Sequence, residues 1–128
     1  MRFDRKYVAW ALSYAAIGIC IGIYMAASQN YAQREAHTHT LLVGFVLSLA
    51  YGVIHKLWIE QPQPVIAKTQ FIVHQAGAVL MSLGLFLLYG NVAPAALLNP
   101  ILGISSLAVL VGVLLMTYMV LKANPART

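Results

Sequence analysis

Four long apolar runs constrain this chain more than any other feature. They cover residues 7–27, 40–59, 69–89 and 101–121 and are nearly free of charged residues. Because a charged side chain at the bilayer centre costs about 2.5 to 3.5 kcal/mol, charged residues mark the ends of membrane spans. Each run has about the 20 residues that a helix needs to cross about 30 Å of hydrocarbon. The sequence therefore predicts an all-α fold, a four-helix transmembrane bundle in a lipid bilayer.

Little of the chain is left outside these runs. With 128 residues, 61% of them hydrophobic and 9% charged, we expect residues 1–128 to form a single integral membrane domain. The first run follows the basic start RFDRK, as the core of a signal peptide would. It is longer than a typical signal core, however, and three more runs follow it. We expect it to stay as the first helix.

The formal net charge of +5 is unevenly distributed. Basic residues gather near both termini and around the connection after the second run, and only Arg34 lies near the other connections. By the positive-inside rule, this pattern predicts that both termini lie in the cytoplasm. The membrane topology thus accounts for the positions of the basic residues. We therefore expect no nucleic acid as a partner.

Small, aromatic and proline residues predict how the helices pack and where they end. Small residues recur at spacings that let helix backbones approach closely, within the bundle or in a homo-oligomer: Gly18 and Gly22, then Gly44, Ser48 and Gly52, then Gly77 and Gly84. Aromatic residues near the ends of the runs are expected to anchor at the membrane interface: Tyr7, Trp10, Tyr24, Tyr31, Trp58 and Tyr89. Asn99 and Pro100 are expected to begin the last helix.

The candidate functional residues are four histidines: His37, His39, His55 and His74. An imidazole can bind iron, copper or zinc, and an ionisable residue within a span is a functional hypothesis by default. We take all four as candidate metal ligands. Each also has a structural interpretation, which is least convincing for His74 because that residue lies inside an otherwise apolar stretch.

Helix geometry limits which histidines can share one site. The 16-residue step from His39 to His55 corresponds to about 24 Å along a helix, so one metal ion cannot bind both. The next helix runs back, which places His74 at about the depth of His55. The pair of His55 and His74 is therefore the simplest copper or zinc site within one chain. His39 is expected to face lipid or another subunit. Its site would then need Tyr24, Met25, Gln33 or a second protomer to complete it.

Other catalytic chemistry has little support in the sequence. The chain contains no glycine-rich phosphate loop, no pair of carboxylates in a span and no CxxC motif. Asp4, Glu35 and Glu60 all lie outside the predicted spans, so they do not support a proton pathway. No complete catalytic constellation is present, and the sequence leaves open whether the protein is an enzyme.

Two stretches resemble a known family. HTHTLLVGFVLSLAYGVIH, residues 37–55, resembles the H-x-H-x-x-L-x-G-F/W stretch of small four-helix bacterial membrane proteins related to subunit I of the haem-copper oxidases and nitric oxide reductases. HQAG, residues 74–77, is similar to the H-x-x-G stretch of their third helix. The resemblance covers about half of the chain, and it implies a place in the bacterial inner membrane.

The resemblance also implies a haem ligand. In the large oxidases, the histidine that matches His39 is an axial ligand of a low-spin haem b. Their second low-spin ligand lies on a helix that this chain lacks. His74 is the other candidate haem ligand here, although it is expected at a different depth. The histidine framework that reduces oxygen or nitric oxide is missing, so the resemblance does not imply that activity.

Two hypotheses follow from these residues. In the first, the protein binds haem b, or alternatively copper or zinc, through its histidines and serves electron transfer or metal handling with a redox or metal-donor partner. In the second, it is a non-catalytic interaction or assembly protein whose histidines are structural. A Soret band that weakens when His39 or His74 is replaced by alanine would favour the first hypothesis.

Overall fold

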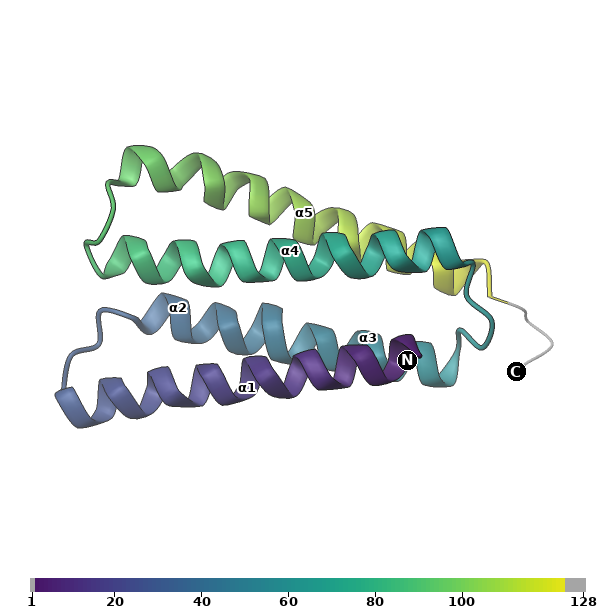
Figure 1. The fold of residues 1–128 in the computed structure, drawn as a ribbon, viewed down its shortest axis with the longest axis horizontal. Helices are drawn as coiled ribbons and strands as arrows, with labels where there is room; N and C mark the ends of the chain where they lie inside the picture. The colour runs from purple at the N-terminus through teal and green to yellow at the C-terminus, as the bar shows by residue number, and fades with distance from the viewer. Residues whose placement is uncertain (1, 124–128) are drawn as a thin grey trace.

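The computed structural model describes residues 2–123. Within that range the chain forms only helices, which are α1 (Phe3–Ser28), α2 (Arg34–His39), η1 (Thr40–Val46), α3 (Leu47–Leu57), α4 (Pro64–Tyr89) and α5 (Ala95–Leu121). α2, η1 and α3 follow one another without a break and make one long helix, Arg34–Leu57. Figure 1 shows the four long helices side by side, with successive helices running in opposite directions.

The four long helices confirm the predicted all-α bundle. They contain 24 to 27 residues each and are long and apolar enough to cross a membrane, so the chain has the architecture of a multi-pass membrane protein. Each helix begins earlier than its predicted run, because polar residues at a membrane surface can continue a helix whose backbone bonds are already satisfied internally.

The two ends of the bundle differ in what they hold. The start of α1, the end of α5 and the connection between α3 and α4 lie at one end, which we call the N/C end. The connections after α1 and α4 lie at the opposite end, the far end (Figure 1). Which of these ends faces the cytoplasm stays a prediction from the charge distribution.

α4 starts with ordinary capping chemistry. The Gln63 side chain accepts a hydrogen bond of 2.8 Å from the backbone N–H of Ile66, and Pro64 occupies the first position of α4. The prediction for the last helix was wrong, because α5 begins at Ala95 and contains Pro100. The preceding Pro94 has the extended backbone of an N-cap, and alanines and leucines, which favour helix, follow it directly.

The second span contains a feature that the sequence did not predict. η1 is a π-helix of seven residues that starts directly after His39. Its wider turn changes which residues of the span face the bundle, compared with an uninterrupted α-helix. Such segments are rare and are frequent at functional sites. The π-helix lies between His37 and His39 in α2 and the residues of α3.

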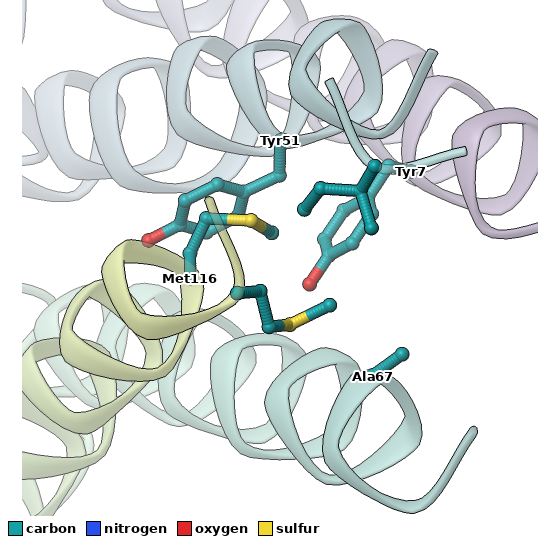
Figure 2. Close-up of a cluster of buried hydrophobic side chains, with 6 residues drawn as sticks. Tyr7, Tyr51, Ala67 and Met116 are labelled. Carbon is teal, nitrogen blue, oxygen red and sulfur yellow. The ribbon is translucent and has the colours of Figure 1, made fainter. Parts of the chain in front are cut away.

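The interior combines an apolar cluster with close backbone contacts. The cluster comprises Tyr7, Tyr51, Ile59, Ala67, Met116 and Met119, and Figure 2 shows Met116 beside the Tyr51 ring. α4 packs mainly against α5, and α1 packs against η1 and α3. A Cβ at Gly77 would lie 3.0 Å from the Ala108 side chain, which confirms that predicted small residues pack within the bundle.

Tyr7 corrects one prediction about the aromatic residues. It was expected to anchor at the membrane interface, but it is 0% exposed and belongs to the apolar cluster. Its ring lies 5.4 Å from that of Tyr51, edge to face. The other predicted anchors are exposed: Trp10, Tyr24, Tyr31, Trp58 and Tyr89. Tyr7 differs because a hydrogen-bond partner for its hydroxyl lies inside the bundle.

Candidate functional site

His74 lies in the middle of the bundle. It follows the start of α4 by ten residues, about 15 Å along the helix, and it is 0% exposed. This is deeper than the sequence predicted, because α4 begins at Pro64. The Nε2 atom of His74 lies 3.0 Å from the Ser48 hydroxyl on α3, so one ring nitrogen is hydrogen-bonded.

A chain of buried polar groups continues from this contact. The side-chain amide of Gln75 donates to the Ser48 hydroxyl at 3.4 Å, and the Tyr14 hydroxyl donates to Oε1 of Gln75 at 2.7 Å. These bonds connect α1, α3 and α4. In lipid such bonds between helices are worth about 0.6 to 2 kcal/mol each.

A second polar group lies one turn closer to the N/C end. The Tyr7 hydroxyl donates to the side-chain carbonyl of Gln70, whose amide donates to the backbone carbonyl of Gly112 at 3.1 Å. Gln70 is 0% exposed and thereby connects α1 and α5 through α4. Neither glutamine was predicted from the sequence as a functional or structural residue. They could have been recognised as two uncharged polar residues within the apolar run 69–89.

Replacing Ser48 with alanine is expected to lower the stability of the bundle by about 1 kcal/mol. The change leaves His74 Nε2 and the Gln75 amide without their hydroxyl partner, and unpaired buried groups are costly. Thermal unfolding in mild detergent measures the effect. Ser13→Ala is the matched control, because the exposed Ser13 hydroxyl bonds only the Ala9 carbonyl one turn back. Equal melting temperatures for the two variants would contradict the assigned role of Ser48.

His55 lies in an aromatic stack nearer the N/C end. Its ring stacks on Phe3 at 5.4 Å and on Tyr7 at 5.8 Å between centroids, and the residue is 4% exposed. The Tyr7 ring also lies 6.2 Å from that of His74. Three buried atoms in this region have no hydrogen-bond partner: Tyr51 Oη, His55 Nε2 and His74 Nδ1.

The predicted pair of His55 and His74 is brought into one region rather than into direct contact. Both rings contact Tyr7, but His74 is level with Ser48, which precedes His55 by seven residues, about 10 Å along α3. In residues 2–123, no three or more His, Cys, Asp or Glu side chains form a group that could hold a metal ion. A copper or zinc site at this pair stays a prediction.

The two histidines at the far end face different surroundings. His37 Nδ1 donates to the backbone carbonyl of Gly18 at 2.8 Å, which joins α2 to α1. His39 Nδ1 donates to the Glu35 carbonyl at 2.9 Å within α2, and 39% of the His39 side chain is exposed. His37 thus contacts a neighbouring helix, whereas the hydrogen bond of His39 stays within α2.

The His39 hydrogen bond sets the tautomer of the neutral ring. A carbonyl oxygen can only accept, so the neutral imidazole carries its proton on Nδ1. Nε2 then keeps its lone pair, as in histidines that ligate metals through Nε2 while Nδ1–H is held by a carbonyl. Nε2 is therefore the nitrogen of neutral His39 that could bind a metal, on a ring that is half-exposed.

His39 and His74 cannot hold one haem within a single chain. Ser48, the partner of His74, follows His39 by nine residues, about 13 Å along the span. One ring is half-exposed and the other is fully buried. A haem with two histidine ligands needs them on opposite faces of one flat macrocycle. The pair therefore does not fit one haem within a single chain.

Comparisons of the chain with protein-family models, with curated proteins and with solved structures found no match. The resemblance to proteins related to subunit I of the haem-copper oxidases therefore stays a prediction from residues 37–55 and 74–77.

Proposed function

We propose that this multi-pass protein of the bacterial inner membrane binds haem b at the exposed face of the Arg34–Leu57 span, with His39 as an axial ligand. The observation that carries the proposal is the hydrogen bond from His39 Nδ1–H to the Glu35 carbonyl. It leaves Nε2 available for iron on a ring that is half-exposed at the membrane-facing side. With both termini in the cytoplasm, as the charges predict, His39 lies toward the periplasmic side.

The surroundings of His39 suit a flat, apolar cofactor. Leu42 and Val46 follow it on the same span and are exposed, so the surface is apolar toward the bundle centre. A second copy that presents the same face supplies the second axial histidine, as an interface with two-fold symmetry requires. His39 of each copy would hold the haem, which would supply one-electron transfer when bound. His74 then serves to hold α3 and α4 together.

The first test is purification in mild detergent with added haem. We expect a Soret band that His39→Ala removes, because the variant loses the iron ligand but keeps the bundle. His37→Ala is the matched control. It lies two residues away on the same helix, and its ring contacts Gly18 inside the bundle.

Three outcomes would contradict the proposal. One is a wild-type protein that stays colourless after haem addition, and another is a Soret band that survives His39→Ala. The third is equal loss of the band in both variants, which would show that helix packing rather than ligation controls it. Recovery of the band in His39→Gly on adding imidazole supports direct ligation.

A second candidate is a non-catalytic assembly protein, and one observation favours it. Every histidine already has a structural contact: His37 with Gly18, His39 with Glu35, His55 with Phe3 and Tyr7, and His74 with Ser48. This candidate predicts a folded, colourless protein with no stoichiometric metal. Elemental analysis of the same purified sample separates it from haem, copper or zinc binding.

A further inference from the structure

A groove lies between α1 and α3 in the half of the membrane next to the N/C end. It has a volume of about 530 Å³, and its lining consists of Asp4, Arg5, Val8, Ala9, Leu12, Gly52, Val53, Lys56 and Leu57. The α1 residues span eight positions, about 12 Å along the helix. The groove therefore runs along the membrane normal rather than across it.

The lining changes from charged to apolar along this direction. Arg5 lies in the first turn of α1 and Lys56 in the last turn of α3, so both cations are at the N/C end. Ala9, Leu12 and Val53 lie deeper and are exposed. A ligand that matches this gradient has an anionic head at the membrane surface and a hydrocarbon tail.

The acidic residue in the lining does not cancel this charge. The Asp4 carboxylate lies 3.1 Å from the Arg2 guanidinium and accepts a hydrogen bond of 2.8 Å from the backbone N–H of Arg5. Its charge is thus balanced by Arg2, a residue outside the groove lining. At the N/C end, the basic residues Arg2, Arg5, Lys6 and Lys56 outnumber the acidic residues Asp4 and Glu60, so the groove entrance is positive. Charge complementarity favours an anionic over a zwitterionic lipid, at about 1 kcal/mol for each basic residue near the surface.

We propose that this groove binds one anionic phospholipid, with its phosphate at Arg5 and Lys56 and an acyl chain along Ala9, Leu12 and Val53. Gly52 contributes no side chain to the bottom of the groove, so the acyl chain can lie against the backbone there. α1 and α3 are in close contact at this point, and a Cβ at Gly52 would lie 3.1 Å from the Val8 side chain. The bound lipid covers part of the seam between α1 and α3. This site lies at the opposite end of the span from His39 and does not depend on haem binding.

The test is a titration of delipidated full-length protein in mild detergent with phosphatidylglycerol, with bound lipid counted by native mass spectrometry. We expect one tightly held lipid, bound about thirtyfold more weakly by the double variant Arg5→Gln/Lys56→Gln. Arg34→Gln/Lys68→Gln removes the same charge outside the groove and is expected to bind as the wild type does. Ala9→Phe fills the groove without changing charge and is expected to weaken binding.

Comparison ligands decide which part of the lipid is recognised. Phosphatidylcholine with the same acyl chains is expected to bind weakly, and inorganic phosphate is expected not to displace phosphatidylglycerol. Displacement by phosphate would overturn the proposal in favour of a simple anion site. Equal retention of both lipids, unchanged binding by Arg5→Gln/Lys56→Gln, or unchanged binding by Ala9→Phe would also overturn it.

Discussion

Replacing Gly44 with leucine is expected to prevent α1 from packing against the second span. A Cβ at this position would lie 2.5 Å from Cγ and 2.6 Å from Cδ1 of the Tyr14 ring. The ring cannot swing away without loss, because its hydroxyl is hydrogen-bonded to Gln75 at 2.7 Å. Overpacking of this kind costs about 1 to 3 kcal/mol, to which the broken polar bond adds. We expect a folded yield well below that of the wild type.

Gly103→Leu is the control for this prediction. It makes the same chemical change in α5, at an exposed position where nothing lies within 4 Å of an added Cβ. It is expected to leave the thermal unfolding in detergent unchanged or to raise its midpoint, because leucine favours helix over glycine. A Gly44→Leu protein that unfolds with the same midpoint as Gly103→Leu would contradict the packing described here.

The second large effect is expected at the bond between Tyr7 and Gln70. Gln70→Leu leaves the buried Tyr7 hydroxyl without its acceptor, which costs about 1 to 3 kcal/mol of unfolding free energy. Tyr7→Phe alone leaves the Gln70 carbonyl unpaired and is also expected to destabilise. The double variant removes both polar groups and is expected to recover part of the loss.

A double-mutant cycle measures this coupling directly. Thermal or denaturant unfolding of the wild type, both single variants and the double variant gives the interaction energy, which we expect to be at least about 0.5 kcal/mol. Additive effects would show that the hydroxyl and the amide do not depend on each other. The cycle also tests whether Tyr7 is buried, as the structure places it, or lies at the membrane interface, as its position in the sequence predicted.

Hydropathy was sufficient to predict the fold but not the helix limits. The four runs predicted the four helices because a bilayer requires long apolar segments with satisfied backbone. The same rule does not say where a helix ends in the polar interface, so the starts at Arg34 and Ala95 were missed. The π-helix at Thr40–Val46 has no marker in hydropathy, because the same apolar residues suit an α-helix equally well.

The candidate site was predictable only in part, because the spacing of residues along one helix does not show which side chains on other helices they contact. His39 was expected to face away from the bundle, and its side chain is 39% exposed. The partner of His74 is Ser48 rather than His55, since α4 starts earlier and shifts the register of the two helices. The roles of Gln70 and Gln75 required knowledge of which tyrosines they face.

We propose that His39 binds the haem and that His74 holds α3 and α4 together. Substitutions of the two residues are therefore expected to affect different properties, the haem spectrum for His39 and the stability for His74. His74→Leu takes away a buried hydrogen bond and is expected to lower stability, while any haem that the folded fraction binds keeps the wild-type spectrum. His39→Ala is expected to leave stability nearly unchanged, because its side chain is half-exposed and bonds only its own helix.

Electron paramagnetic resonance of the haem-loaded protein tests the central claim most directly. We predict a low-spin ferric signal typical of two histidine ligands, with one haem for every two chains, and its loss in His39→Ala. His74→Leu is expected to keep the signal in its folded fraction. An unchanged low-spin signal in His39→Ala, or a folded wild-type protein that binds no haem, would contradict the account.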